Sequence, residues 1–401
     1  MASILYKGNV SIDPVRKNLK AKLEVFYNCL DKDIKTLEFG IYNTEALKVS
    51  GEYVESVKIL KNEDLSPFLL GHSKIIIQLK DLGHIKELAI QFNYEINFQF
   101  YPKEGMNAFT ERYIELGLYT PWYPLNLNFP EVLYQIQMEV PEGYRVLGAK
   151  RDLNQNWLLE ENKNPHADIA FIIAKKCAEG KSHLGPIVVD YFRDSEGEVA
   201  KILQEKVQKS FEFFSQHFGE SGKDNFHIAL VPRDNTESSG GYCRPKLITI
   251  PIGENRHNNG RYSENQASYL LEYMLHEMGH LWWSKADCFS REDWLNESFA
   301  EYSKYIALAY LEGESYYEEK MESLRIRGEQ MPVPWQKNLD SQERFEPMRV
   351  RGPYELYQIE KQIGRGNLLE IFKEIHLEKA ATTQAVFDII NKRANIELKD
   401  R

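Results

Sequence analysis

Hydrophobic and polar residues alternate along much of the first half of the chain. The alternation is clear in residues 21–28, 73–79, 87–100 and 133–140, and residues 169–174 form a short apolar run. Gly, Asn, Asp and Pro residues stand at the ends of these segments, as is typical of strands. Because a period of two buries one face and leaves the other in water, the pattern predicts antiparallel β-sheets. We therefore expect a β-rich N-terminal domain over residues 1–191.

The pattern changes to helical spacing after residue 191. Residues 195–218 carry apolar residues three and four apart from Val199 to Phe214, with a Ser near the start and Gly219 after the end. Residues 226–231 are predicted to form a strand. Five further helical segments are predicted at residues 265–283, 297–311, 354–363, 368–377 and 383–391. The chain is thus expected to be an α+β protein, with a second, mostly helical domain over residues 192–401.

Charge and composition limit the possible partners. The chain has 401 residues, with 50 Lys and Arg against 60 Asp and Glu, and a formal net charge of −10. An acidic chain without basic stripes argues against nucleic acid, since the phosphate backbone favours positive surfaces. No basic run indicates an anionic membrane surface, and no apolar run approaches the roughly 18 residues of a transmembrane helix.

The location of the protein is expected to be cytoplasmic. The N-terminus lacks a basic region followed by an apolar one, so no signal peptide is predicted. The four cysteines are scattered, with no C-x-x-C pair, and are interpreted as reduced residues of an intracellular protein. The sequence leaves the oligomeric state open.

The strongest chemical signal is the run His276-Glu277-Met278-Gly279-His280. Two histidines four residues apart in a helix lie on one face, so both imidazoles can bind one metal ion. The glutamate between them makes no ligand contact in such motifs and can accept a proton from water. The alternative interpretation is a pair of exposed helix histidines that bind no metal.

A third ligand is needed, because catalytic zinc has three protein ligands and one open position. Trp294-Leu295-Asn296-Glu297 lies downstream, where Asn296 can cap a helix and Glu297 falls in its first turn. By itself Glu297 would be explained by the helix dipole, which favours a carboxylate at this end. With the two histidines present, we favour Glu297 as the third ligand.

These segments resemble one family, the gluzincin metallopeptidases related to aminopeptidase N and leukotriene hydrolase. The zinc-binding segments are HEMGHLWW and WLNESFAEY. SSGGYCRPKLIT (residues 238–249) is similar to the family's glycine-rich substrate strand, and RGPYELYQIEKQIG (residues 351–364) to its catalytic tyrosine segment. Residues 139–149 resemble a pair of β-strands in its N-terminal domain.

The resemblance implies a thermolysin-like catalytic domain that cleaves peptides with one Zn²⁺ per chain. The expected ligands are His276, His280 and Glu297, and Glu277 is the expected general base. Tyr354 is expected to donate a hydrogen bond to the oxyanion of the reaction. A tyrosine alone would be interpreted as an ordinary core or cap residue, and the R-G-P-Y-E context carries the assignment. The expected substrate-binding residues lie in the glycine-rich strand: Gly240, Gly241, Tyr242 and Cys243.

The sequence departs from the family around the zinc ligands. Sixteen residues separate His280 from Glu297, two fewer than is usual in the family. The family's acid that supports a zinc ligand is replaced by Lys304. Glu301, one turn after Glu297, is a candidate to orient a ligating histidine instead. A solvent-exposed helix glutamate is the alternative interpretation of Glu301.

A second set of departures concerns the substrate. Cys243 stands where the family has the glutamate that binds the substrate's free amine, and a thiol cannot pair with an ammonium group. The N-terminal segment that loosely matches the other amine anchor, residues 122–125, has no acid. The family usually continues with a large helical domain that closes the cleft, so a more open site is expected here.

Three functional hypotheses follow. The first is a zinc peptidase with weak or atypical recognition of the N-terminal amine. The second is an ordinary aminopeptidase that uses another acid as anchor, with Glu237 and Glu272 as candidates. The third is a zinc-holding peptide-binding module with little catalysis, which the retention of Glu277 and Tyr354 argues against.

Overall fold

The computed structural model describes most of the chain in fifteen segments. These are residues 3–28, 33–44, 46–66, 69–83, 85–98, 107–109, 113–129, 131–175, 178–179, 187–192, 197–222, 226–232, 240–252, 264–288 and 290–398. The chain divides into two compact units. One spans Met1–Ala178, Val231–Gly240 and Arg244–Leu247, and the other Glu179–Leu230, Gly241–Cys243 and Ile248–Arg401. The expected boundary at residue 191 stays a prediction.

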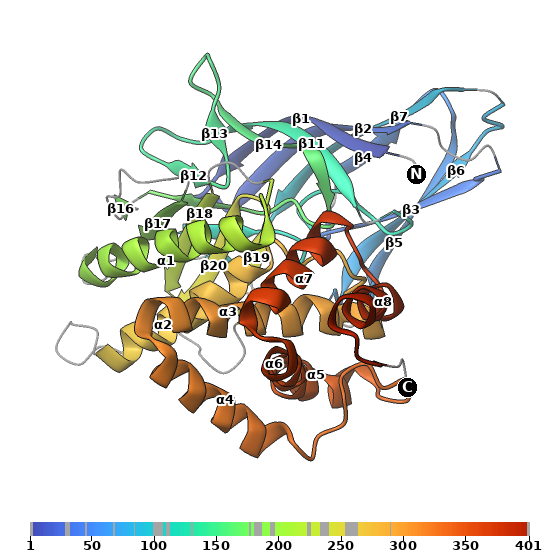
Figure 1. The fold of residues 1–401 in the computed structure, drawn as a ribbon. Coiled ribbons are helices and arrows are strands. Elements are labelled where there is room, and N and C mark those ends of the chain that lie inside the picture. Colours follow the sequence, from blue (N-terminus) through green and yellow to red (C-terminus); the bar gives the residue numbers. More distant parts are fainter. Residues whose placement is uncertain are drawn as a thin grey trace. The chain divides into compact units, whose positions relative to one another are not determined.

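The first unit contains a large sheet that, within the described residues, has seven strands (Figure 1). In order across the sheet they are β13 (Lys150–Arg151), β14 (Trp157–His166), β11 (Val132–Glu139), β1 (Ser3–Asp13), β2 (Asn18–Asn28), β7 (Glu87–Asn97) and β4 (Ala46–Ser50). The neighbours pair antiparallel except β1 and β11, which are parallel. Buried and exposed residues alternate along β2 and β7, as the sequence pattern predicts.

Two smaller sheets complete the β-structure of the first unit. One contains β10 (Leu125–Asn126), β3 (Thr36–Ile41), β6 (His72–Leu79) and β5 (Val54–Glu63). The other contains β12 (Arg145–Leu147), β15 (Phe171–Ala174), β9 (Tyr113–Leu116) and β8 (Ala108–Phe109). Residues 139–149 contain the end of β11 and all of β12, but the two strands lie in different sheets and each pairs with a distant segment. The resemblance of this segment to the family stays a prediction.

A mixed sheet and the helices form most of the second unit. The sheet order is β16 (Ala178–Glu179), β17 (Ile187–Tyr191), β18 (Phe226–Pro232), β20 (Leu247–Ile252) and β19 (Tyr242–Arg244), with β17 and β18 parallel. The helices are α1 (Gly197–Phe218), α2 (Glu264–Gly279), α3 (Trp294–Glu312), α4 (Glu314–Gly328), α5 (Ser341–Arg349), α6 (Arg351–Ile363), α7 (Arg365–Leu377) and α8 (Thr383–Ala394). A 3₁₀ turn, Arg291–Asp293, precedes α3.

The α+β class with β-strands first and helices later is confirmed (Figure 1). The six predicted helical segments correspond to α1, α2, α3, α6, α7 and α8. The prediction that the zinc-motif helix continues to residue 283 is wrong, because α2 ends at Gly279. The next residues form a turn held by specific contacts: the indole Nε1 of Trp282 donates to the carbonyl of Gly219, and that of Trp283 donates to Ser303 Oγ.

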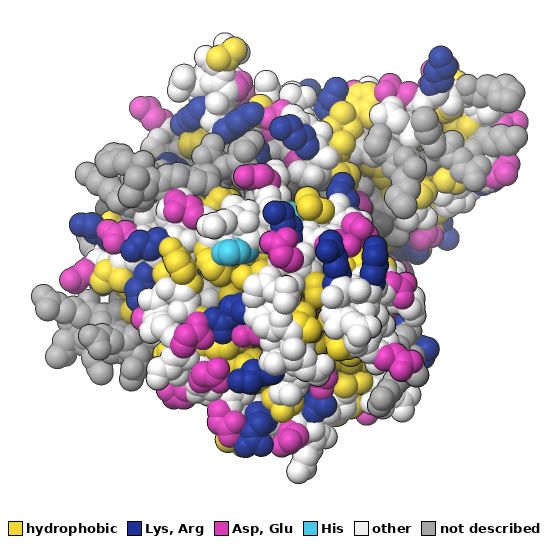
Figure 2. All heavy atoms as spheres, viewed as in Figure 1, with side chains coloured by type: hydrophobic (Ala, Val, Ile, Leu, Met, Phe, Trp, Pro, Cys, Tyr) yellow, Lys and Arg dark blue, Asp and Glu magenta, His cyan; other side chains and the backbone are white. Residues whose placement is uncertain are grey.

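The described surface is mixed in character. On the face in Figure 2, basic and acidic side chains are interspersed, with hydrophobic side chains between them. None of the helices that the structure describes is both long and apolar enough to cross a membrane.

Candidate metal centre and active site

The metal centre is formed by two helices that approach closely. Gly279 at the end of α2 faces Ala300 of α3, and a Cβ atom on Gly279 would lie 2.9 Å from Ala300 Cα. Only a residue without a side chain fits at this distance. The close approach brings the first turns of α3 beside the end of α2, where His276 lies in the last turn and His280 directly follows the helix.

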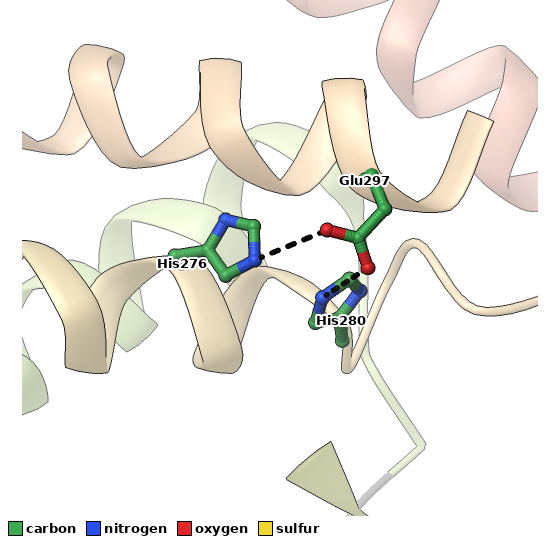
Figure 3. A group of neighbouring side chains, drawn as sticks. All are labelled: His276, His280 and Glu297. Atoms are coloured by element: carbon green, nitrogen blue, oxygen red, sulfur yellow. Dashed lines mark ion pairs between the residues drawn. The ribbon is translucent and has the colours of Figure 1, made fainter. Parts of the chain in front are cut away.

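His276, His280 and Glu297 converge on one point between these helices (Figure 3). The two ligand nitrogens and a carboxylate oxygen lie within 4.8 Å of one another. His276 Nε2 is 3.5 Å from Glu297 Oε2, and His280 Nε2 is 3.6 Å from Glu297 Oε1. The structure therefore brings together all three residues that the sequence predicts as ligands, despite the shortened connection.

The other ring nitrogen of each histidine also has a partner. His280 Nδ1 lies 3.0 Å from the carbonyl oxygen of Trp283, and His276 Nδ1 lies 2.8 Å from Glu301 Oε2. A carbonyl can only accept, so this contact fits a proton on His280 Nδ1, which leaves Nε2 as the nitrogen that faces Glu297. Contacts of this kind orient metal-binding histidines.

Glu301 is buried and belongs to a small polar cluster. Its carboxylate contacts Lys304 Nζ and accepts a hydrogen bond from Tyr305 OH at 3.0 Å. Burial raises the pKa of Glu301, but Lys304 and His276 outweigh it and hold the pKa well below its ordinary value. Glu301 is thus a charged group turned toward His276, and the interpretation as a solvent-exposed glutamate is wrong.

The metal-free centre favours positive charge. Burial lowers the pKa of His276, but the neighbouring carboxylates of Glu297 and Glu301 outweigh this and raise the pKa to about 10. Burial likewise opposes the charged form of Glu297, yet the two histidines keep its pKa well below the ordinary range. A proton on His276 therefore supplies the positive charge that this cluster of carboxylates favours.

Glu277 follows His276 on α2 and is buried, with 6% of its surface exposed. Burial raises its pKa, and the charge of Glu297 adds to that effect, while the two histidines and Arg349 oppose it. A carboxylate with a raised pKa is a better proton acceptor near neutral pH than an exposed one. Its environment therefore fits the role of general base.

Arg349, at the end of α5, is a site residue that the sequence does not predict. Its NH2 and Nε atoms lie 3.1 Å and 3.3 Å from Glu297 Oε2. Arg349 is five residues before Tyr354, but no spacing rule connects it to a metal ligand. Only the fold, by placing α5 against α3, reveals the contact.

Tyr354 lies in the first turns of α6 and is buried. α6 begins against the first turn of α3: a Cβ atom on Gly352 would lie 2.0 Å from Ser298 Oγ. Ser298 follows Glu297 directly and donates a hydrogen bond to the carbonyl of Met348 at 2.6 Å. These contacts hold the segment that bears Tyr354 against the segment that bears the third ligand.

The glycine-rich segment lies at the edge of the mixed sheet. Tyr242 and Cys243 begin β19, the edge strand beside β20, and Gly240 and Gly241 precede it. The backbone N–H of Gly241 donates to the hydroxyl of Tyr273, which stands on α2 one turn before Glu277. Tyr273, unforeseen from the sequence, thus connects this strand to the helix of the metal centre.

The alternative amine anchors are not equally available. Glu272 accepts a hydrogen bond from Tyr316 OH at 2.7 Å and forms an ion pair with Lys320 at 2.9 Å. Its charge is therefore already neutralised by a residue of α4. Glu237 lies outside the described residues.

Asn296 has a different role from the one predicted. The N-cap of α3 is Asp293, and the Asn296 side chain instead bonds to both backbone groups of Ala286, at 3.1 Å and 3.0 Å. Its amide also donates to Asp293 Oδ1 at 2.9 Å. Burial, together with the charge of Glu297, raises the pKa of Asp293 to about 7. Asn296 therefore ties the loop after the zinc motif to the start of α3.

The donor set fits Zn²⁺. Two imidazole nitrogens and one carboxylate are the ligands of many catalytic zinc sites. The Nδ1 atom of each imidazole contacts a further residue, Glu301 or Trp283. The Glu297 carboxylate reaches the two histidines from a second helix (Figure 3). The carboxylates of Glu297 and Glu301 on either side of His276 favour a cation at this place, and they raise the pKa of His276 for the same reason.

Comparison with known proteins gives matches to solved structures alone. No family model matches the chain, and no curated protein matches it. Native yeast LTA4 hydrolase superposes with a TM-score of 0.70 at 14% identity, over 99% of this chain and 67% of that one. Native leukotriene A4 hydrolase from Saccharomyces cerevisiae gives 0.70 at 12% identity, over 98% of this chain and 65% of that one.

A bacterial structure is similar over almost its whole length. The M1 zinc metallopeptidase from Deinococcus radiodurans superposes with a TM-score of 0.67 at 15% identity, covering 98% of this chain and 90% of that one. The chain therefore spans about two thirds of the yeast hydrolases and most of the bacterial protein. At these identities the likeness concerns the architecture: the chain has the fold of the M1 zinc metallopeptidases.

Proposed function

We propose that the chain is a zinc-dependent peptidase. The observation that carries the proposal is the convergence of His276, His280 and Glu297 beside the buried Glu277. The fold, similar to an M1 zinc metallopeptidase and to leukotriene A4 hydrolases, supports the same chemistry. Peptides are accordingly the proposed substrates.

His276, His280 and Glu297 would hold one zinc ion. When bound, zinc polarises a carbonyl and lowers the pKa of a water molecule. Glu277 accepts the proton of the attacking water and passes it to the nitrogen of the leaving amine. The raised pKa of Glu277 suits it to hold this proton between the two steps.

Tyr354 and the glycine-rich strand would act on the substrate. Tyr354 donates a hydrogen bond from its hydroxyl to the oxyanion that forms from the scissile carbonyl. Gly240 and Gly241 allow a peptide backbone to approach and pair along the edge strand. Tyr242 and Cys243 line the first substrate pocket. Each of these roles is carried over from the family resemblance.

Recognition of the free N-terminus is proposed to be weak. Cys243 offers no charge to an ammonium group, and Glu272 is already paired with Lys320. A charge-assisted hydrogen bond to such a group contributes ~1.5–3 kcal/mol, or roughly 10–150-fold in preference. The ordinary aminopeptidase hypothesis requires an acid with a free charge in place of these two residues.

The test is hydrolysis of matched peptides with free and N-acetylated termini, with products identified by mass spectrometry. We expect acetylation to change the rate by less than about threefold, since no charged anchor is lost. The Cys243→Glu variant should cleave the free peptide preferentially, and Cys288→Glu serves as a control at an exposed cysteine. A strong preference for free N-termini in the unaltered protein would favour an aminopeptidase, and binding without cleavage would favour a peptide-binding module.

A further inference from the structure

The guanidinium beside the metal ligand points to a specific class of substrate. We propose that Arg349 binds a carboxylate of the substrate within one or two residues of the scissile bond, either the C-terminal carboxylate or an acidic side chain. This inference deepens the proposed peptidase function and rests on it.

Arg349 reaches both the metal centre and the solvent. Its NH2 and Nε atoms contact Glu297 Oε2, while its side chain is 40% exposed. The guanidinium carbon lies 4.2 Å above the ring of Phe345, which is itself 55% exposed. The Arg349 guanidinium thus packs on the Phe345 ring and remains accessible to a molecule in solvent.

Donor groups of Arg349 remain for a second partner. The guanidinium has five N–H donors in a planar fork that matches a carboxylate. Among the described residues, Glu297 is the sole carboxylate that contacts it, and no contact uses its NH1. An additional carboxylate can therefore bind to the other edge of the fork.

Two nearby arginines form ion pairs with glutamates that lie outside the proposed metal centre. Arg351 pairs with Glu355 at 2.5 Å on the same helix, and Arg327 pairs with Glu346 at 3.5 Å between α4 and α5. Neither contacts a residue of the proposed centre through its ion pair. Arg349 differs because its acidic partner is also a proposed metal ligand.

Metal loading would change the balance of charge around Glu297. Without metal, the Glu297 carboxylate is paired with the Arg349 guanidinium and lies within 3.6 Å of a ring nitrogen of both His276 and His280. If the Glu297 carboxylate also held a divalent cation, its single negative charge would be shared between that cation and the Arg349 guanidinium, and the two positive groups would repel each other. A substrate carboxylate on Arg349 relieves that repulsion, whereas a substrate ammonium increases it.

The experiment measures binding to the zinc-loaded Glu277→Gln protein, in which binding is separated from turnover. Isothermal calorimetry compares two pairs of N-acetylated tripeptides. One pair differs by a free or amidated C-terminus, and the other, with amidated ends, differs by Glu or Gln in the last position. The same pairs are measured after adding Arg349→Gln, Arg349→Lys or the control Arg327→Gln, with zinc content determined for each.

We expect the carboxylate member of at least one pair to bind roughly 10–100-fold more tightly than its neutral partner. Arg349→Gln should bring this ratio near one with zinc content unchanged, Arg349→Lys should retain part of it, and Arg327→Gln all of it. The pair that responds identifies the C-terminal carboxylate or the side chain as the group bound. A ratio near one in the parent, or a ratio that survives Arg349→Gln, overturns the inference.

The proposed function fails separately. If the protein with Glu277 intact and zinc bound cleaves no peptide while the Arg349-dependent ratio persists, peptide binding is correct and peptidase activity is wrong. If the protein cleaves peptides without any preference for a carboxylate, peptidase activity is correct and the role of Arg349 is wrong.

Discussion

Glu277 is the residue on which the proposed reaction depends most, because it is the one buried carboxylate assigned to proton transfer and not to the metal. Glu277→Gln keeps the shape of the side chain and removes the base. We expect zinc binding and thermal stability to be retained, and turnover to fall by at least roughly 10²-fold, the scale of lost general acid–base catalysis. Glu319→Gln, at an exposed position of α4, is the matched control.

Peptide turnover, bound zinc and the melting temperature should be measured on the same preparations. Near-normal turnover in Glu277→Gln would show that another group takes the proton, and loss of zinc would show that Glu277 belongs to the ligand set.

Glu297 tests the ligand set itself. Glu297→Ala should weaken zinc retention and activity together, since two histidines alone hold zinc poorly. Metal analysis after dialysis is the measurement, with Glu319→Ala as control. A variant that keeps a full equivalent of zinc would place the third ligand elsewhere.

His276 gives a pH prediction. Its pKa is about 10 in the metal-free fold, against an ordinary 6.5. Zinc needs the deprotonated ring, so binding at pH 7.5 should release about one proton from His276. Calorimetry in two buffers of different ionisation enthalpy counts that proton. Metal binding without proton release at pH 7.5 would mean that His276 is already neutral.

The same shift sets the pH dependence of stability. Between pH 6.5 and about 10 the metal-free folded state holds a proton on His276 that the unfolded chain has lost. The free energy of unfolding should therefore fall as pH rises through this window. Zinc-loaded protein lacks that proton and should show a flatter profile in urea titrations. A metal-free profile that is equally flat would contradict the shift.

At the residue scale, the sequence is informative where spacing dictates geometry. Two histidines four apart on a helix must share a face, whereas Glu297 is favoured as the third ligand only because these two histidines precede it. Arg349 and Tyr273 cannot be found this way. Arg349 reaches the site from another helix, and Tyr273 contacts the backbone N–H of Gly241 in a distant segment, so helical spacing reveals neither contact.

At the scale of elements, the close packing of α6 on α3 can be tested by substitution of Gly352. A Cβ atom on Gly352 would lie 2.0 Å from Ser298 Oγ and 2.6 Å from Ser298 Cβ. Gly352→Ala must therefore displace α6, and overpacking of this kind costs about 1–3 kcal/mol. Because Ser298 adjoins Glu297 and Tyr354 lies on α6, turnover should fall as well.

Gly366→Ala is the control, since a Cβ atom on this α7 residue meets nothing within 4 Å. It should be neutral or slightly stabilising, by up to about 1 kcal/mol. Urea denaturation of both variants gives the comparison. Equal stabilities for the two variants would contradict the tight packing of α6 on α3.

Three elements that the sequence does not predict, α4, α5 and β1, have a weak periodicity of hydrophobic residues. α4 contains the buried Tyr317, Met321 and Leu324, but charged residues surround them on a short segment. α5 has nine residues and contains Pro347, which normally argues against a helix interior. In β1 the alternation is interrupted by Gly8, so the pattern does not predict a strand of eleven residues. In each case tertiary packing, and not local periodicity, decides the structure.

At the scale of the whole chain, the order of β-structure and helices follows from the change of period near residue 191. The number of sheets, the parallel pairing of β1 with β11 and the division into units do not. Those features depend on contacts between distant segments. The likeness to an M1 zinc metallopeptidase concerns this architecture, whereas the contact of Arg349 with Glu297 is seen in the structure of this chain itself.

The central claim is that one zinc ion at His276, His280 and Glu297 makes the chain a peptidase. The most direct measurement is a titration of zinc into metal-free protein, in which bound zinc and cleavage of an N-acetylated peptide are followed together. The account predicts no cleavage without metal, and a rise that saturates at one equivalent of zinc per chain. Cleavage that is unaffected by metal removal, or a fully loaded protein that cleaves no peptide in a broad library, would contradict it.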